Sequence, residues 1–137
     1  MTVVLDAYAV LAVLKGERAA APVEDILRTS EARLTALGVA EVMDHLVRLQ
    51  GADEDEVALD LAQLGLLDAP PLTPEAARGA GVLRARHYHR LSRAVSMADC
   101  VVAESARLAG AAVATADPHL LDLCRDEGIE VIELPGN

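Results

Sequence analysis

Four acidic residues occupy positions at which folding could bring their carboxylates together. They are Asp6, Glu41, Asp99 and Asp117. Asp6 directly follows the apolar run 2–5, and Asp117 follows the small apolar run 111–115, so each comes after a predicted buried strand. Asp99 lies at a predicted helix start, and Glu41 lies in the first turns of another helix. Because functional crevices of open α/β sheets lie beyond the carboxyl ends of the strands, we expect the four carboxylates to converge there.

Such a cluster needs a cation, because like charges raise each other's pKa and resist full ionisation. An all-oxygen set without nearby His or Cys suits Mg²⁺ or Mn²⁺ better than zinc. These ions activate water and neutralise a phosphodiester in the transition state. The hypothesis that follows is metal-assisted hydrolysis of a phosphodiester.

Each acid also has a purely structural interpretation. Asp6 and Asp117 are good helix N-caps, and Asp117 is followed by proline. Ser96 and Asp99 have the spacing of a capping box, and Glu41 has the pattern of an exposed helical glutamate. Taken singly, each acid favours the structural interpretation, but their shared location at strand ends and helix starts weakens it for the set.

The elements that must position these acids alternate along the chain. Strands are predicted over residues 2–5, 33–36, 111–115 and 130–134, with a further candidate at 66–72. Helices are predicted over 7–14, after Pro22, over 39–49 and 53–64, from Pro74 through the arginine-rich stretch, over 96–108 and from Asp117 onward. This alternation predicts one α/β domain over residues 1–137, a three-layer α/β/α sandwich with a central, mostly parallel sheet.

Composition excludes several other classes. A chain of 137 residues with 53% apolar and 25% charged residues fits one globular domain. Two tyrosines without Phe or Trp disfavour RNA-binding modules built on aromatic stacking. Cys100 and Cys124 lie in apolar runs without metal-binding spacing, which predicts buried, unreactive thiols in a reducing compartment. Without a charged leader or a run of roughly 18 apolar residues, we expect a cytoplasmic protein without a membrane partner.

The distribution of charge leaves two interpretations open. The net charge of −10 opposes nucleic-acid binding, yet residues 78–93 hold five arginines, two histidines and no carboxylate. As a continuous helix, this segment would place Arg86 and Arg90 on one side, where they could lead RNA phosphates toward the acids. Alternatively, the segment is a solvated helix paired with surface acids, or part of a dimer interface.

The motifs around the four acids resemble those of one known family, the PIN domains, and especially the VapC-type toxins among them. The resemblance covers essentially the whole chain, and its most specific parts are the S-x-A-D and T-x-D elements. The matching segments are Val3-Val4-Leu5-Asp6-Ala7, Ala40-Glu41-Val42, Leu91-Ser92, Ser96-Met97-Ala98-Asp99-Cys100 and Ala114-Thr115-Ala116-Asp117. The chain also departs from the family at three positions. Relatives often have a small hydroxyl residue at the position of Tyr8, a polar residue at that of Ala40 and an arginine at that of Ala116.

The resemblance implies an endoribonuclease dependent on Mg²⁺ or Mn²⁺ that acts as the toxin of a toxin-antitoxin pair. By analogy, Asp6 and Asp99 hold the metal directly, while Glu41 and Asp117 bind it directly or through water. Thr115 then holds a carboxylate or a phosphate by a hydrogen bond, although a plain strand threonine is the alternative. The implied partners are RNA, a VapB-like antitoxin and a second copy of the chain.

Two other hypotheses compete with this one. A non-catalytic PIN-like interaction module would use the acids only as helix caps, but the presence of all four acids argues against it. A receiver or haloacid-dehalogenase-like domain also has Asp after its first strand. The receiver needs a lysine after a late strand, whereas Lys15 is the only lysine, and the dehalogenase needs an acid where Tyr8 stands.

Overall fold

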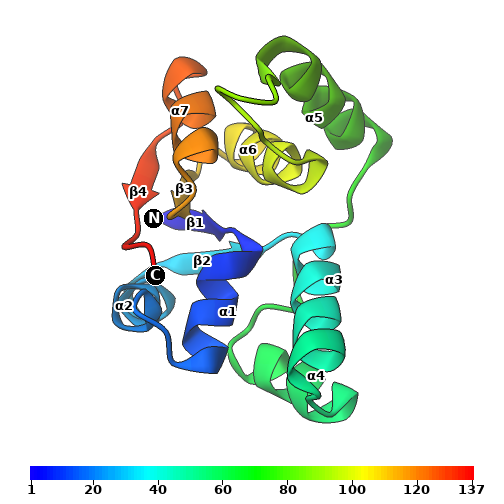
Figure 1. Cartoon of the computed structure of the whole chain (residues 1–137), viewed down its shortest axis with the longest axis vertical. Helices are drawn as coiled ribbons and strands as arrows, with labels where there is room; N and C mark the ends of the chain where they lie inside the picture. Colours follow the sequence, from blue (N-terminus) through cyan, green and yellow to red (C-terminus); the bar gives the residue numbers. More distant parts are fainter.

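Four parallel strands form the centre of the molecule. In the computed structural model, which describes residues 1–137, they are β1 (Thr2–Leu5), β2 (Glu31–Leu34), β3 (Ala112–Thr115) and β4 (Val131–Glu133). Their order across the sheet is β2-β1-β3-β4, and every pair is parallel (Figure 1). All four strands therefore end at the same edge, where the sequence predicts the functional crevice.

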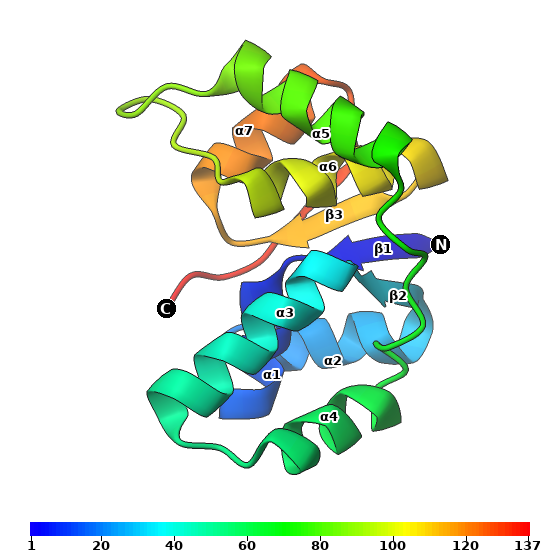
Figure 2. The ribbon, with the colours of Figure 1, turned by 90° about the vertical axis from the view of Figure 1, so that its right-hand side faces the viewer.

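Helices cover both faces of this sheet. The helical segments are α1 (Ala7–Lys15), α2 (Ala20–Thr29), α3 (Ala36–Asp44) with its π-helical extension η1 (His45–Leu49), α4 (Glu54–Gln63), α5 (Pro74–His87), α6 (Met97–Ala109) and α7 (Pro118–Asp126). Figure 2 shows α1, α2, α3 and α4 on one side of the sheet and α5, α6 and α7 on the other. The predicted three-layer sandwich is confirmed. None of the helices combines the length and apolar composition needed to span a bilayer.

The side chains of β1 explain why this strand lies at the centre. Val3 and Leu5 belong to the apolar cluster under α1 to α4, whereas Val4 belongs to the cluster under α5 to α7. Because successive side chains of a strand point to opposite faces, a continuous apolar run suits a strand that is covered on both sides. Cys100 and Cys124 are free thiols in the second cluster, as predicted, and burial raises their pKa values to about 11 and about 12.

Three predicted boundaries in the first half of the chain are wrong by two or three residues. β2 spans 31–34 rather than 33–36. α2 begins at Ala20, so Pro22 lies within its first turn, where the missing N–H is not needed. α3 begins at Ala36 rather than residue 39, because Thr35 caps it by accepting a hydrogen bond from Gly38 N at 2.9 Å.

Two larger predictions are also wrong. Residues 66–72 form no strand, because Leu66 N bonds back to Leu61 O and Pro70 and Pro71 have no N–H to donate to a sheet. α5 ends at His87 and does not continue to residue 93. His89 closes a turn with Arg93, and its ring Nδ1 accepts the N–H groups of the two residues that follow Arg90, each at 3.2 Å. These local bonds replace helical ones.

Replacing either of two glycines of α5 by alanine should have different effects on stability. A Cβ on Gly79 would lie 1.7 Å from Glu104 Oε2 and 2.5 Å from its Cδ, and Glu104 is only 3% exposed. We expect Gly79→Ala to lower the free energy of unfolding by about 1–3 kcal/mol, as overpacking does. Gly81 has nothing within 4 Å of an added Cβ, so Gly81→Ala should be neutral or stabilise by up to about 1 kcal/mol. Urea unfolding of both variants checks the contrast, and equal effects would contradict it.

Candidate active site at the carboxyl edge of the sheet

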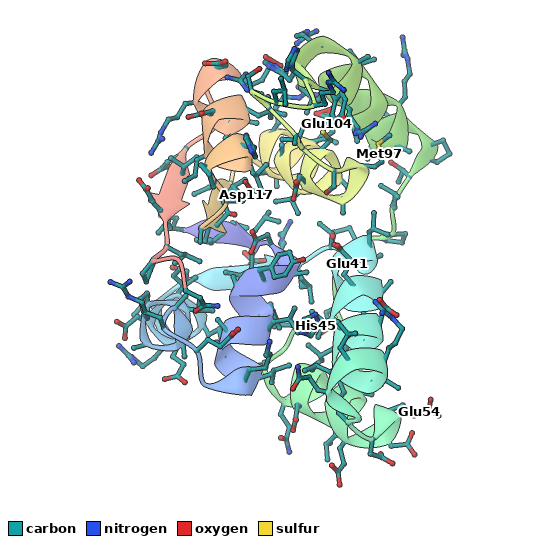
Figure 3. All side chains as sticks on the ribbon, in the orientation of Figure 1. Glu41, His45, Glu54, Met97, Glu104 and Asp117 are labelled. Atoms are coloured by element: carbon teal, nitrogen blue, oxygen red, sulfur yellow. The ribbon has the colours of Figure 1, made fainter.

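The structure brings all four acids to the carboxyl edge of the sheet. Asp6 directly follows β1, Asp117 follows β3 by two residues, Glu41 lies on α3 and Asp99 lies in the first turn of α6. Figure 3 shows Glu41 at the end of α3 nearest the sheet and Asp117 between β3 and α7, so the two acids come from opposite layers of helices. Burial is the largest cause of the raised pKa values of Asp6 and Glu41, and the acids also act on one another: Asp99 and Asp117 add to the shift of Asp6, and Asp99 and Asp6 add to that of Glu41.

Asp6 is the most deeply buried of the four, with 5% of its surface exposed. Its Oδ1 accepts a hydrogen bond from Ala9 N at 2.8 Å and thereby caps α1, while its Oδ2 accepts one from the Thr115 hydroxyl. Burial raises the pKa of Asp6 to about 6, even though these two hydrogen bonds favour the ionised form. Asp6 is therefore a carboxylate that lacks a positive partner.

Thr115 links two of the acids. Its Oγ1 donates to Asp6 and accepts from Asp117 N at 3.0 Å, and the residue is fully buried at the end of β3. Both hydrogen bonds are thus made to the acid cluster. Of the roles considered from the sequence, the one these contacts support is holding a carboxylate.

Asp99 and Asp117 also cap helices, as the structural interpretation predicts. Asp99 Oδ2 accepts from Ser96 N at 2.9 Å, and Asp99 N donates to Ser96 Oγ at 3.0 Å, which completes a capping box. Asp117 Oδ1 accepts from His119 N at 2.9 Å at the start of α7. The pKa of Asp99 is nevertheless raised, first by burial and then by Asp117. Asp99 and Asp117 can therefore cap helices and also belong to the acid cluster, because a helix cap uses only some of the hydrogen bonds that a carboxylate can accept.

No arginine or lysine pairs with this cluster, and of the basic side chains only His119 lies close enough to Asp99 to lower its pKa, as the smallest of the causes. The ion pairs of the protein involve other acids, and none includes Asp6, Glu41, Asp99 or Asp117. Yet no three His, Cys, Asp or Glu side chains are gathered as a ready-made ligand set. A Mg²⁺ ion is commonly held by one or two carboxylates together with water, so an all-oxygen cluster of unpaired acids fits such an ion.

The arginine-rich segment is largely engaged within the protein. Arg86 pairs with Glu127 at 2.7 Å, and Arg93 pairs with Asp126 at 2.6 Å while donating to His87 Nδ1 at 2.9 Å. Arg90, at the exposed turn after α5, makes no ion pair. For Arg86 and Arg93, the interpretation as partners of surface acids is thus the one observed, whereas Arg90 remains open to solvent.

A contact that sequence reasoning missed connects α5 to the start of α6. Arg84 Nε donates to Val95 O at 3.1 Å, and its guanidinium lies 4.3 Å from the centroid of the Tyr88 ring. Val95 directly precedes Ser96, the cap that holds Asp99. Arg84 therefore anchors the segment that positions Asp99. A lone arginine in a basic run carries no sequence signal for such a role.

We expect Arg84→Gln to loosen this segment, because glutamine is too short to keep the bond to Val95. The free energy of unfolding should fall by about 1 kcal/mol, and the Asp99 amide, bonded to Ser96 Oγ, should exchange with solvent faster. Arg78→Gln is the matched control, since Arg78 lies on the same helix, is exposed and makes no ion pair. Equal exchange at the Asp99 amide in both variants would contradict this role of Arg84.

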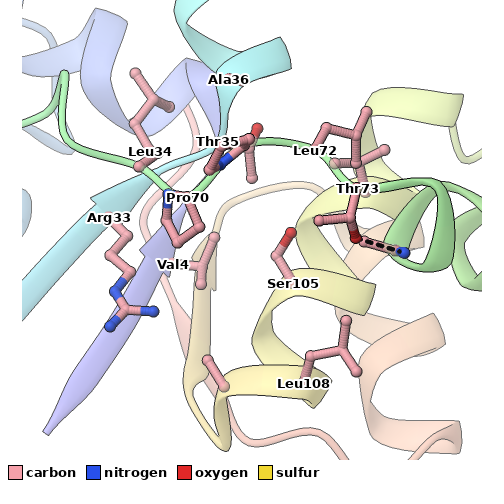
Figure 4. Close-up of a pocket in the computed structure, with 15 residues that line it drawn as sticks. Val4, Arg33, Leu34, Thr35, Ala36, Pro70, Leu72, Thr73, Ser105 and Leu108 are labelled. Carbon is pink, nitrogen blue, oxygen red and sulfur yellow. Dashed lines mark hydrogen bonds between the residues drawn. The ribbon is translucent and has the colours of Figure 1, made fainter.

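A separate apolar cavity lies away from the acids. Its volume is about 320 Å³, and it opens between α6, the carboxyl half of β2 and the segment 69–73 (Figure 4). Thr73 at its rim accepts from Ala76 N at 3.1 Å and caps α5. None of the four acids lines this cavity, so it is distinct from the candidate active site.

Comparison with solved structures finds the same fold in several known proteins. VapBC2 from Rickettsia felis, bound to a DNA fragment from its promoter, aligns with a TM-score of 0.70 at 14% identity over 98% of this chain and 100% of that one. FitAcB from Neisseria gonorrhoeae aligns with a TM-score of 0.69 at 18% identity over 96% of both chains. VapBC-1 from nontypeable Haemophilus influenzae gives 0.68 at 14% identity over 97% of this chain and 98% of that one.

Sequence comparison adds the family. Among curated protein sequences, none matches the chain. The sequence profile of the PIN domain matches residues 3–126. This range includes all four acids of the edge and every element except β4 and the first residue of β1. The chain therefore belongs to the PIN domain family.

Proposed function

We propose that this single-domain protein is a metal-dependent endoribonuclease that acts as the VapC-type toxin of a toxin-antitoxin pair. The observation that carries the proposal is the cluster of four carboxylates without a positive partner at the carboxyl edge of the sheet. PIN domains are typically nucleases that use divalent metal ions, and the likeness to toxin-antitoxin structures supports the toxin role.

We assign each of the four acids a role that fits its surroundings. We assign Asp6 and Asp99 to hold a divalent ion directly, with Glu41 and Asp117 completing the shell, in part through water. When bound, a Mg²⁺ or Mn²⁺ ion would make water more acidic and neutralise charge on the phosphate. Glu41, whose carboxylate makes no hydrogen bond within the protein, orients the attacking water and takes its proton. The water oxygen bonds to phosphorus, the bond between phosphorus and the 3′ oxygen breaks, and that oxygen takes a proton from solvent, which yields a 5′-phosphate and a 3′-hydroxyl.

Neighbouring residues support these acids. Thr115 holds the carboxylate of Asp6 and the backbone of Asp117 in place through its two hydrogen bonds. Of Arg86 and Arg90, the two arginines that the sequence suggests for RNA phosphates, we assign Arg90 to this role, because it is exposed and makes no ion pair. Arg86 can join it only by giving up part of its contact with Glu127. This pairing limits the electrostatic contribution of the segment to RNA binding.

The proposed partners follow from the toxin role. They are RNA as substrate, a VapB-like antitoxin as inhibitor and a second copy of the chain as homodimer partner, all in the cytoplasm. Two of the structures similar to this chain are described as VapBC proteins and another as a toxin-antitoxin complex from Klebsiella pneumoniae, which supports the antitoxin.

The test is cleavage of an RNA pool by the purified, antitoxin-free protein. We expect cleavage with Mg²⁺ or Mn²⁺, none in EDTA, and product ends that an exonuclease specific for 5′-monophosphates can digest. Products with 2′,3′-cyclic phosphates would contradict attack by water. No cleavage of any RNA, together with no thermal stabilisation by divalent ions, would favour the non-catalytic interaction module, in which the acids act only as the helix caps described above.

A further inference from the structure

Tyr8 is an exposed aromatic residue beside the candidate active site. It is the second residue of α1, two positions after Asp6, which caps that helix. Its neighbours Ala7 and Ala9 are buried, whereas Tyr8 is 69% exposed and its hydroxyl makes no hydrogen bond. A largely apolar ring is therefore exposed to solvent in the first turn of the helix that Asp6 caps.

No internal contact explains this ring. The only other aromatic residue is Tyr88, which is stacked against the Arg84 guanidinium at 4.3 Å. The packing of the protein itself therefore does not account for the exposed ring.

The charges around the site limit how RNA can be bound there. The chain carries a net charge of −10, and the four acids lack a positive partner, so this edge repels phosphates in the absence of a cation. Arg86 and Arg93 of the basic segment are held by Glu127 and Asp126. Stacking of a base on an aromatic ring depends little on charge and tolerates any base, because every base presents a π face.

We propose that Tyr8 is a nucleobase platform, on which an unpaired base of the RNA stacks as the neighbouring phosphate enters the acid cluster. The inference rests on the proposed ribonuclease function and deepens it, because it makes single-stranded RNA with unstacked bases the substrate class. Tyr8 is a binding residue and takes no part in proton transfer. Its loss therefore affects KM more than kcat.

Kinetics with a single-stranded RNA oligomer test the role in binding. Tyr8→Ala should raise KM by about 10-fold while kcat changes by less than about 2-fold, and Tyr8→Phe should restore the wild-type KM because its ring still stacks. Leu59→Ala is the matched control, since Leu59 is also exposed but lies on α4, and its KM should not change. An unchanged KM in Tyr8→Ala, while wild type cleaves, would overturn the platform and leave the ribonuclease intact.

Proton and carbon NMR of ¹³C-tyrosine protein gives a direct readout of stacking, because the chain has only two tyrosines. In Asp99→Asn protein, which should not cleave, the RNA oligomer should move the Tyr8 ring signals upfield and leave those of Tyr88 in place. An abasic oligomer with the same phosphates should cause no such shift. Equal shifts with both oligomers would overturn stacking. A Tyr8→Ala variant that binds RNA as well as wild type does, but no longer binds the antitoxin, would overturn it too. Failure of wild type to cleave any RNA would instead contradict the proposed function itself.

Discussion

Replacing Asp6 or Asp99 by asparagine should lower the rate of RNA cleavage by at least about 100-fold, the usual scale for losing one group that stabilises transition-state charge. Asparagine keeps the size of the side chain but loses the negative charge that holds a divalent ion. Both variants should remain folded, because asparagine caps helices about as well as aspartate. Circular dichroism and initial cleavage rates at fixed Mn²⁺ check the two parts of this expectation.

The matched control is Asp60→Asn. Asp60 is an exposed acid of α4, on the far side of the molecule from α6, and it pairs with no basic side chain. The change removes the same charge without touching the edge of the sheet, so cleavage should stay within about 2-fold of wild type. A similar loss in Asp60→Asn would mean that overall charge, and not the acid cluster, controls the rate. Full activity in both folded edge variants would rule out the proposed site.

The second large effect concerns stability in the absence of metal. The folded protein binds a proton at Asp6 more tightly than the unfolded chain does, because burial raises the pKa from 3.8 to about 6. The stabilising contribution of protonated Asp6 is complete below pH 4 and is lost as the pH rises through 6. Above that range, the ionised Asp6 costs up to about 3 kcal/mol, since each pKa unit is worth ~1.4 kcal/mol.

Asp6→Asn should therefore be more stable than wild type at pH 7.5 in EDTA, by less than about 3 kcal/mol because its amide nitrogen cannot accept the Thr115 hydroxyl, and this advantage should be lost near pH 4. Added Mn²⁺ should reverse the order, because the ion binds the folded wild type and stabilises it by mass action. Urea unfolding of both proteins at the two pH values, with EDTA or Mn²⁺, measures all of these differences. A wild type that is the more stable protein at pH 7.5 in EDTA would contradict the uncompensated charge of Asp6.

The sequence predicts the centre of the fold well because the burial of each strand is encoded locally. The run Val3-Val4-Leu5 feeds both apolar clusters, and Gly110 ends α6 with a left-handed φ of 62° just before β3. The strand predicted over residues 66–72 is wrong because the three leucines of this segment give it the apolar composition of a strand, whereas only Leu66 is buried. The end of α5 depends on the ring of His89 accepting two backbone N–H groups, which no periodicity reveals.

In the candidate site too, features that depend on neighbouring residues can be predicted from the sequence, whereas contacts between residues far apart in the chain cannot. Asp6, Asp99 and Asp117 can be placed from their neighbours in the chain, since each lies after a strand or at the start of a helix, whereas Glu41 lies in the second turn of α3. The bond from Thr115 to Asp6 joins residues 109 positions apart, and the pairing of Arg86 with Glu127 joins residues 41 apart. Such contacts depend on how the two layers of helices pack against the sheet. They decide which carboxylates are uncompensated and which arginines remain for RNA.

The most direct test of the carboxylate site is to locate the ion itself. Crystals of the protein soaked in Mn²⁺ should show an anomalous difference peak in contact with the carboxylates of Asp6 and Asp99, and the peak should be absent from Asp99→Asn crystals treated in the same way. That result would establish the edge of the sheet as a divalent-metal site. A wild-type crystal without manganese at this edge, or with its peak only at other acids such as the Asp53–Glu56 run, would contradict the account.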